Sequence, residues 1–441
     1  MINREERETT RRTFLKAGGA AAAGLSLAGQ ARAAGKAEVL ALKGGPKAVT
    51  APVGDAMKWP QYGRDEEMAV LELVRNPNYG TIAPFEKAWA EYFKMPFVKA
   101  HTNGTSALTS MLFALDLPAG SEILVASYTT WFPWAGPRMF GIVPRFVDID
   151  PRTLNISVED CRKRLTKDVK GILAVDWFGV PCEMDALADF AREKGLILLE
   201  DCSHAHGASV QGKLIGTWGR MSAFSLQMGK PLPAIEGGMA MYYERSDFER
   251  AVTYGNYDLP KTFPEDSPYR KYDQTAFGGK LRIHPMSAAL GHCQLKKLDE
   301  HNKRIVALND GLNKRLEQLP GLAAQYARPD MQRVYYRDNI LLIDERKAGL
   351  PRDAIVKALK AEGVSVSTFS WNVLHKYPFF REAQWWHHVP ADPGDLTGSD
   401  EANRRAISIP IFTNAAPELI DQYVKAFEKV WAHREMLAKV G

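Results

Sequence analysis

Short apolar segments alternate with helical patterns along the middle of this 441-residue chain, and this alternation restricts its fold more than any other feature. The segments that are typical of short buried strands are 123–125, 144–147, 171–175, 196–199, 223–226 and 239–242. Helical patterns lie between them, such as 184–194, which Gly195 closes. Strands that alternate with helices predict an α/β fold, with a mostly parallel sheet covered by helices on both faces.

The pattern changes near residue 285. A long helical stretch is predicted over 286–319, a strand over 339–343 and a helix over 352–362. A further strand at 407–409 and a last helix over 416–438 follow. We therefore predict a large domain over 34–285, including the N-terminal segment, and a smaller C-terminal α+β domain over 286–441.

Composition excludes several classes of protein. Hydrophobic residues make up 45% and charged residues 25%, which is typical of globular chains and not of disordered or collagenous ones. Four cysteines in this length cannot define a disulfide scaffold, and their spacing is not that of a zinc site. We interpret Cys161, Cys182, Cys202 and Cys293 as buried thiols, with one bridge left open, and expect no metal.

The first 33 residues have the layout of an export signal. Arg11 and Arg12 precede a weakly apolar run, and Ala31-Arg32-Ala33 offers a cleavage site between small residues. Paired arginines indicate a twin-arginine signal, so we expect a periplasmic or secreted protein with no membrane association once the signal is removed. The signal holds three more basic than acidic residues, and the rest is near neutral at about +2, which gives no support for nucleic-acid binding.

Reactive residue types follow the predicted strands. In an open parallel sheet, ligands bind beyond the carboxyl ends of the strands. Asp201 follows 196–199, Lys230 follows 223–226, and Gly104, Thr105 and Ser106 open a helical pattern. Pyridoxal phosphate needs these three kinds of group: a lysine for its Schiff base, a carboxylate for its ring nitrogen, and a helix N-terminus for its phosphate. Ser225 would add a hydroxyl at the phosphate.

Each of these features has an ordinary structural explanation when it is taken alone. An aspartate at a strand end often caps a helix, a loop lysine is usually a solvated charge, and an N-G-T-S segment is usually a plain helix N-terminus. Their joint order and spacing are what favour a cofactor site. The adjacent His387 and His388 cannot easily share a metal ion without other ligands, so we do not expect a metal site there.

Four segments carry a family resemblance that covers roughly residues 40–435. They are 103–108 (N-G-T-S-A-L), 146–150 (F-V-D-I-D), 200–207 (E-D-C-S-H-A-H-G) and 224–230 (F-S-L-Q-M-G-K), the last followed by Gly237-Gly238. On these motifs the chain resembles the DegT/StrS family of pyridoxal-phosphate-dependent sugar aminotransferases. The resemblance implies the fold type I of pyridoxal-phosphate-dependent transferases, the architecture of aspartate aminotransferase.

The resemblance also implies roles for individual residues. Lys230 would carry the Schiff base and Asp201 would pair with the pyridine nitrogen. Gly104, Thr105, Ser106 and Ser225 would hold the phosphate, and His204 would contact the cofactor ring. His206 is equally well explained as a core histidine.

Three positions depart from the family pattern. Thr130 stands where the family has an aromatic ring stacked on the cofactor, so Trp131 either takes that role or packs in the core. The segment Gly279-Lys280-Leu281-Arg282 stands where the family often has N-Y-R, which reaches the partner subunit's phosphate. Lys280 would make the same contact as a point charge. Asp176 replaces a common histidine. These departures do not affect Lys230 or Asp201, and they leave the identity of the substrate open.

We therefore predict a homodimeric aminotransferase with shared active sites. It would transfer an amino group from glutamate or glutamine to an oxo-sugar or cyclitol, in two half-reactions. The alternatives are a sugar dehydratase with the same cofactor, and an exported, catalytically idle relative that binds a sugar. Lys230 argues against the dehydratase, because histidine replaces that lysine in the known dehydratases of this fold.

Overall fold

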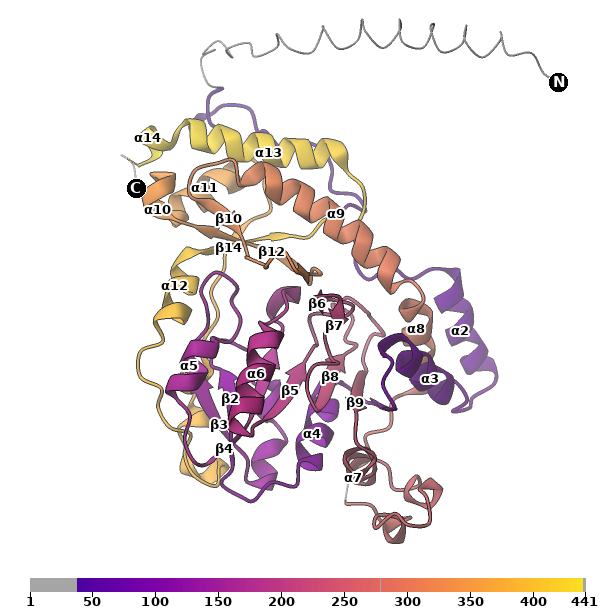
Figure 1. Cartoon of the computed structure of the whole chain (residues 1–441). Helices are drawn as coiled ribbons and strands as arrows, with labels where there is room; N and C mark the ends of the chain where they lie inside the picture. Colours follow the sequence, from indigo (N-terminus) through magenta and orange to yellow (C-terminus); the bar gives the residue numbers. More distant parts are fainter. Residues whose placement is uncertain (1–37, 278, 439–441) are drawn as a thin grey trace, which may run out of the picture. The chain divides into compact units, whose positions relative to one another are not determined.

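The computed structural model describes residues 38–277 and 279–438, and its largest element is a seven-stranded sheet (Figure 1). The strand order is β1-β9-β8-β5-β4-β2-β3. Strands β3, β2, β4, β5 and β8 are parallel, whereas β9 is antiparallel to both β8 and β1. The bounds are β1 Phe97–His101, β2 Glu122–Ala126, β3 Val143–Val147, β4 Val169–Val175, β5 Ile197–Asp201, β8 Met221–Ser225 and β9 Gly238–Tyr242. The predicted α/β fold with a mostly parallel sheet is confirmed.

Helices cover this sheet. Helix α4 packs on β8 and β9, and α6 packs on β4 and β5. The helices of this part are α2 Arg64–Arg75, α3 Ile82–Phe93, α4 Gly104–Ala114, α5 Val158–Lys163, α6 Met184–Lys194 and α7 Arg245–Gly255. Helix α6 ends as the sequence predicts, because Gly195 adopts the left-handed conformation that closes a helix (φ 64°).

Short elements complete this part of the chain. A three-stranded sheet has the order β11-β6-β7. Its strands are β11 Met331–Gln332, β6 Ser209–Val210 and β7 Lys213–Leu214. The 3-10 turns are η1 Ala41–Lys43, η2 Phe132–Trp134, η3 Pro137–Phe140, η4 Trp177–Gly179, η5 Pro260–Thr262, η6 Arg270–Tyr272, η7 Leu374–Lys376, η8 Pro378–Phe380 and η9 Ala383–Trp385.

A second, antiparallel sheet forms in the C-terminal part, with the order β10-β12-β14-β13. Its strands are β10 Leu322–Ala324, β12 Asp338–Ile343, β13 Ser367–Thr368 and β14 Ala406–Pro410. The helices here are α8 Pro285–Leu295, α9 Leu298–Leu316, α10 Glu345–Ala348, α11 Arg352–Ala361, α12 Thr397–Arg405, α13 Pro417–Ala432 and α14 Arg434–Leu437. Helices α9 and α13 lie side by side (Figure 1).

The two hydrophobic cores do not divide the chain at one sequence position. Leu40, Ala48 and Ala56 pack in the core of the second sheet, although chain order placed the N-terminal segment with the large domain. Conversely, Phe380 and Trp386 pack in the core of the first sheet. Burial of apolar side chains, and not chain order, decides which core a segment joins. The boundary at residue 285 itself stays a prediction.

Two long predicted helices are each interrupted. The stretch 286–319 is divided between α8 and α9 at Lys296 and Lys297, where the Lys297 amine bonds the carboxylate of Glu66 on α2. The stretch 416–438 is divided at His433. The helical pattern continues through both breaks, so periodicity alone did not reveal them.

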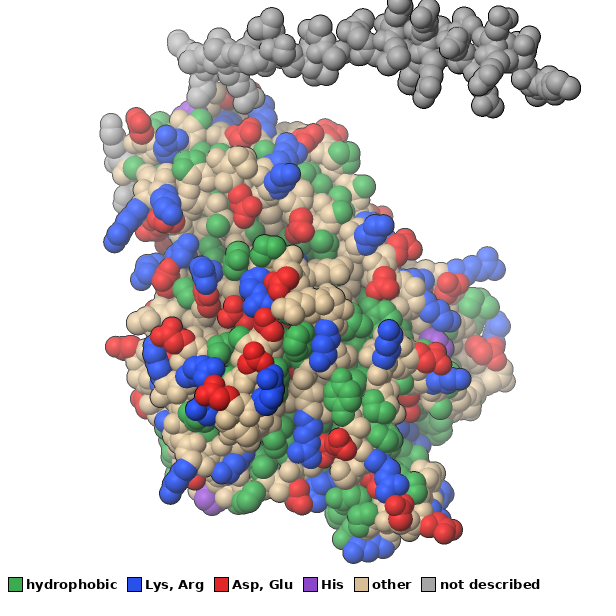
Figure 2. Space-filling view, viewed as in Figure 1, with side chains coloured by type: hydrophobic (Ala, Val, Ile, Leu, Met, Phe, Trp, Pro, Cys, Tyr) green, Lys and Arg blue, Asp and Glu red, His purple; other side chains and the backbone are tan. Residues whose placement is uncertain are grey.

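Charges are mixed on the face that Figure 2 shows, where Lys and Arg side chains are interspersed with Asp and Glu. Cys161, Cys182 and Cys202 are buried free thiols, and Cys293 is a partly buried one. Among the described helices, none is long and apolar enough to cross a membrane. The predicted twin-arginine signal lies outside the described residues.

Candidate active site

A cavity of about 440 Å³ lies at the carboxyl ends of β4, β5 and β8. Six of the nine residues predicted from the sequence line it: Gly104, Thr105, Asp201, His204, Ser225 and Lys230. The parallel register explains this convergence, since Asp201 pairs with Val175 at the end of β4 and with Ala223 on β8. Its volume is in the range of small-molecule sites.

The N-terminus of α4 forms one wall of the cavity. Asn103 caps the helix, because its side chain accepts a hydrogen bond from the Ser106 N–H (2.8 Å). The first N–H groups of a helix have no partner within it, so those of Gly104 and Thr105 remain available to an anion. A Cβ at Gly104 would lie 2.6 Å from the Cβ of Ser225. Glycine therefore allows α4 to approach the end of β8 closely.

Asp201 ends β5 and is almost fully buried. Its Oδ1 accepts a hydrogen bond from the Ser203 N–H (3.1 Å). Burial raises the pKa of Asp201, while the bond from Ser203 and the charge of Lys230 act in the opposite direction. A cation that approaches Asp201 would favour its ionised form.

Lys230 lies in a tightly bonded loop. Its backbone N–H donates to the Gln227 carbonyl (2.8 Å), and its own carbonyl accepts from the Trp59 indole N–H (3.0 Å). The Nζ atom lies 4.3 Å from the centre of the Tyr336 ring. The pKa of Lys230 is lowered to about 8, chiefly by burial; the charge of Asp201 acts against burial, and the charge of Arg337 acts with it. The amine therefore loses its proton more readily than an ordinary lysine, as a nucleophile or base requires.

Aromatic rings surround His204. Tyr336 stacks on the imidazole with ring centres 4.1 Å apart, and Trp177 lies at 4.9 Å. Burial lowers the pKa of His204 well below its ordinary value, so the ring is neutral. Its Nδ1 accepts from the Phe178 N–H (3.4 Å). The proton of the neutral ring is therefore on Nε2, which can donate to an acceptor.

The structure places three of the predicted residues outside this cavity. The Ser106 hydroxyl bonds the Thr102 hydroxyl (2.8 Å) instead. Trp131 is 51% exposed and lines a neighbouring groove, so it neither packs in the core nor lines the cavity. Lys280 lines a separate cavity of about 840 Å³, which shares Glu236 with this one. His206 is a core histidine that packs against Phe224.

Sequence reasoning missed part of the lining. Phe132, Trp371, Tyr336 and Arg337 all line the cavity. Phe132 lies two residues after Thr130, the position where the family has an aromatic ring. The sequence Trp131-Phe132 therefore indicated an aromatic residue nearby, but it did not show which of the two lines the cavity. Tyr336 and Arg337 follow β11, far along the chain, and no motif marked them.

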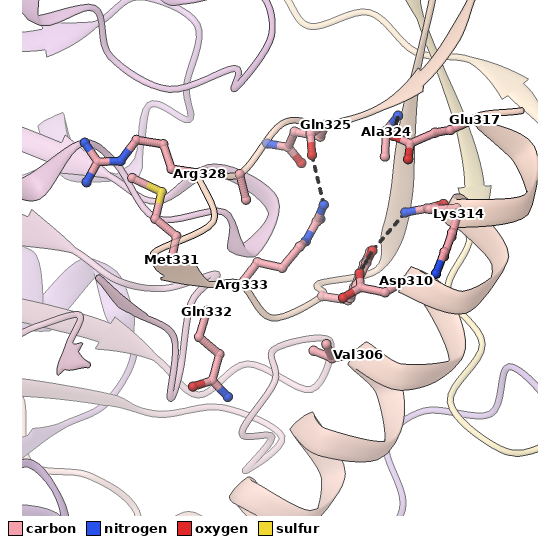
Figure 3. A pocket seen from close by; sticks show the side chains of 13 residues that line it. Val306, Asp310, Lys314, Glu317, Ala324, Gln325, Arg328, Met331, Gln332 and Arg333 are labelled. Atoms are coloured by element: carbon pink, nitrogen blue, oxygen red, sulfur yellow. Dashed lines mark hydrogen bonds between the residues drawn. The ribbon is translucent and has the colours of Figure 1, made fainter. Parts of the chain in front are cut away.

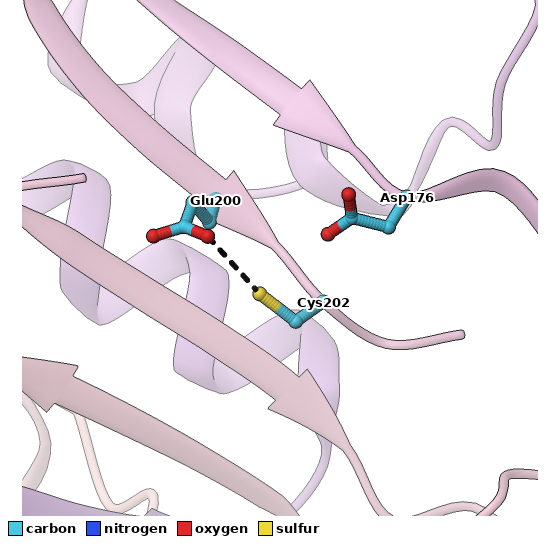
Figure 4. A group of neighbouring side chains, drawn as sticks. All are labelled: Asp176, Glu200 and Cys202. Carbon is cyan, nitrogen blue, oxygen red and sulfur yellow. Dashed lines mark hydrogen bonds between the residues drawn. The ribbon is translucent and has the colours of Figure 1, made fainter. Parts of the chain in front are cut away.

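Behind Asp201, a second group of acidic and thiol side chains is sealed in the core (Figure 4). Glu200 accepts three backbone N–H bonds, from Gly216 (2.7 Å), Trp218 (2.7 Å) and Gly219 (2.6 Å). Asp176 and Cys202 lie beside it. Burial raises the pKa of Glu200 to about 7 and that of Asp176 well above its ordinary value.

Another pocket, of about 410 Å³, lies between α9 and the segment 324–335 (Figure 3). Arg333 is only 7% exposed there, and its guanidinium donates to the Gln325 carbonyl (3.2 Å) and lies over the Tyr335 ring. None of the individual residues predicted to bind the cofactor lines this pocket.

The cavity at α4 fits pyridoxal phosphate on its own chemistry. Asp201 and Lys230 supply an acid and an amine, and the close approach of α4 to Ser225 forms a cradle that any Cβ at Gly104 would fill. Lys230 would bind the cofactor aldehyde and Asp201 would face its ring nitrogen. Thr105, Ser225 and the start of α4 would hold the phosphate.

Comparison with known proteins identifies the family of this chain. Residues 63–428 match the family described as the DegT/DnrJ/EryC1/StrS aminotransferase family. The L-glutamine:scyllo-inosose aminotransferase of Streptomyces griseus is 30% identical over 419 residues, which cover 89% of this chain and 97% of that protein.

Solved structures agree on the fold. An aminotransferase from Psychrobacter cryohalolentis matches with a TM-score of 0.76 at 25% identity, covering 86% of this chain and 99% of that one. A GDP-4-keto-6-deoxymannose-3-dehydratase matches with a TM-score of 0.73 at 19% identity, covering 84% and 100%. The fold therefore does not by itself distinguish amino transfer from dehydration.

Proposed function

Because the chain belongs to the DegT/DnrJ/EryC1/StrS aminotransferase family, we propose that it transfers an amino group from an amino acid to a ketone of a sugar or cyclitol. It is an enzyme of the pyridoxal-phosphate-dependent class. The observation that carries the proposal is the convergence of Lys230, Asp201 and the start of α4 on one cavity.

When bound, pyridoxal phosphate supplies an aldehyde that condenses with amines and a protonated ring that withdraws electrons from the reacting carbon. Asp201 holds the ring proton in place by its negative charge. The N–H groups of α4 and the hydroxyls of Thr105 and Ser225 bind the phosphate and fix the orientation. Lys230 Nζ would take a proton from the α-carbon of the donor and deliver it to the carbon that was the cofactor's aldehyde, and its lowered pKa suits both steps.

The substrate class follows from the relatives. The Streptomyces griseus protein, by its name, takes its amino group from L-glutamine and passes it to a cyclitol ketone. It matches this chain over almost its whole length, which favours glutamine or glutamate as the donor here and a cyclitol or an oxo-sugar as the acceptor.

A spectroscopic experiment tests the proposal. The visible absorbance band of the holoenzyme should bleach when L-glutamine or L-glutamate is added and return when scyllo-inosose or a keto-sugar is added. Lys230→Ala is the control and should show no bleaching. If neither amino acid changes the visible band of the holoenzyme, the result would contradict amino transfer. It would favour a catalytically idle sugar-binding protein or a sugar dehydratase.

We propose further that the enzyme is a homodimer whose subunits complete each other's sites. Apolar side chains of α2 and the loop after it are exposed: Met68 (50%), Leu71 (38%), Val74 (58%) and Tyr79 (62%). Val74 and Tyr79 line the same cavity as Lys280. An apolar surface of this kind is typical of an interface.

Mixed dimers test the contribution of Lys280. If Lys280 acts in the partner's site, co-expressed Lys230→Ala and Lys280→Gln chains should restore about a quarter of the parent activity, because half of the dimers then hold one intact site. Each variant expressed alone should be inactive or weak. If activity is not restored, or if the Lys280→Gln dimer is fully active, the proposal that Lys280 acts in the partner's active site is wrong.

We also propose export by the twin-arginine route, which rests on Arg11 and Arg12. Changing both to lysine should leave folded holoenzyme in the cytoplasm, as fractionation would measure. A double variant that still reached the periplasm would contradict this.

A further inference from the structure

Arg337 is a cation of the active-site cavity that no motif marked. Four ionic side chains line the described cavity: Asp201, Lys230, Glu236 and Arg337. The cofactor would occupy Asp201 and Lys230. Arg337 is then the cationic side chain of the described cavity that remains available to bind a substrate.

The backbone directs Arg337 into the cavity. In an extended segment, consecutive side chains point to opposite sides, yet Tyr336 and Arg337 both line the cavity. Arg337 breaks the alternation because it adopts the left-handed conformation (φ 57°), which is uncommon and strained for a residue with a side chain. The Arg337 carbonyl accepts from the Ile411 N–H (3.3 Å), which helps to hold this conformation.

The Lys230 loop packs against Arg337. A Cβ placed on Gly229 would lie 3.9 Å from Arg337 Cγ and 3.7 Å from Tyr336 Cε2. The Arg337 side chain therefore packs near Gly229, the residue that precedes Lys230. Its charge contributes to the lowered pKa of Lys230.

Two neighbouring arginines differ in how their charges are used. Arg333 is buried over the Tyr335 ring and donates to Gln325, in the pocket of Figure 3. Arg337 is exposed and forms no salt bridge with another described residue, although its charge partly offsets the burial that raises the pKa of Asp338, the next residue in the chain. Its guanidinium is available to an incoming anion.

We propose that Arg337 binds the α-carboxylate of the amino-acid donor and so selects amino acids over other amines; this rests on the aminotransferase function proposed above. An α-carboxylate is one bond from the carbon that bears the amine, which matches a cation beside the Lys230 loop. A phosphate on an acceptor would lie several bonds from its reacting carbon. The planar guanidinium fork also suits a carboxylate.

Donor titrations of the holoenzyme test this. Arg337→Gln should raise the apparent dissociation constant for L-glutamate or L-glutamine, read from the bleaching of the visible band, by about tenfold to hundredfold, as expected for one charge-assisted pair. The dissociation constant of Arg337→Lys should lie between those of the parent and of Arg337→Gln, because lysine keeps the charge but lacks the planar guanidinium group. The acceptor KM should be unchanged in both variants.

Two comparisons separate binding from structural damage. 4-Aminobutanoate is glutamate without its α-carboxylate, and its weak reaction should be the same in the parent and in Arg337→Gln. Binding of glutarate, followed by calorimetry, should weaken in Arg337→Gln without any turnover. Lys314→Gln removes an exposed cation from the pocket of Figure 3 and should change none of these values.

The outcomes distinguish this proposal from the function on which it rests. If the parent responds to no amino acid, the aminotransferase proposal fails. If the parent responds and Arg337→Gln binds the donor equally well, the role of Arg337 alone is wrong. A raised acceptor KM with an unchanged donor constant would assign Arg337 to the acceptor and overturn the proposal.

Discussion

Asp201 and Glu200 are neighbouring carboxylates at the end of β5 that point to opposite sides of the sheet. Asp201 faces the cavity that holds Lys230, and among the described residues it accepts hydrogen bonds from Ser203 alone. Glu200 faces the core beside Asp176 and Cys202 (Figure 4). Three backbone N–H groups donate to its two oxygens there. The same chemical group is thus left open to a ligand on one side and fixed as a structural acceptor on the other.

The contrast shows that burial alone does not identify a reactive acid. Burial raises the pKa of both carboxyl groups. What differs is the partner: Asp201 has a nearby cation and an open cavity, whereas the oxygens of Glu200 are occupied by the loop 216–219. The comparison predicts that amide substitutions at the two positions damage different properties.

Asp201→Asn should have the largest effect, on rate. The change keeps size and hydrogen bonding but removes the charge that keeps the cofactor ring protonated. We expect kcat to fall by about a thousandfold or more, which corresponds to ~4 kcal/mol. The cofactor should stay bound through Lys230 and α4, so the visible band persists. If stopped-flow assays showed undiminished turnover, Asp201 would not be needed for the reaction, and the proposed contrast with Glu200 would be wrong.

Glu200→Gln is the matched variant on the other side of the sheet, and it should affect stability instead. Glutamine has one acceptor oxygen and presents N–H groups to backbone donors, so at least one buried N–H loses its partner. At about pH 8, where Glu200 is ionised, the free energy of unfolding should fall by about 1–3 kcal/mol.

Two measurements check the Glu200 variant. Denaturant titration should show the lower midpoint, and kcat at saturating substrate should stay within about tenfold of the parent. If the variant lost rate as Asp201→Asn does, while its stability was unchanged, Glu200 would belong to the chemistry rather than to the core.

Asp176→Asn should have the smallest effect, visible in the pH dependence of stability. A raised folded-state pKa means that the native chain binds more protons than the unfolded chain. The stability contributed by such an acid is present below its ordinary pKa and is lost as pH rises through the folded pKa. For Glu200 that window runs from 4.5 to about 7, and for Asp176 it begins at 3.8.

The Asp176 variant removes one of the two titrations. Relative to the parent, its free energy of unfolding should therefore rise by about 1 kcal/mol or more between about pH 5 and about pH 8. Urea titrations at several pH values measure this difference. A constant difference across the range would show that Asp176 is not held protonated in the core.

Several features of the site were accessible from the sequence because they are local. Asp201 and Lys230 each follow a strand whose apolar run is visible, and Gly104-Thr105 opens a helix that Asn103 caps. Short-range patterns specify such strand ends and caps. The family motifs then indicated that these residues bind one cofactor, pyridoxal phosphate.

Other features depended on packing between distant segments. Trp131 and Phe132 are equally good aromatic candidates in the sequence, and the turn η2 decides that Phe132 lines the cavity while Trp131 lines another groove. Arg337 enters the site through a single left-handed residue 107 positions after Lys230, and no local pattern predicts that conformation.

By itself the sequence determined the alternating order of strands and helices, the acid and the lysine at strand ends, and the family. These depend on periodicity and on motifs within a few residues of each other. Only the tertiary structure decided which core the N-terminal segment joins, that Glu200 is enclosed while Asp201 is open, and that Arg337 lines the same cavity as Lys230. Those outcomes arise from contacts between segments far apart in the chain, where burial and hydrogen bonding select among residues that are chemically alike.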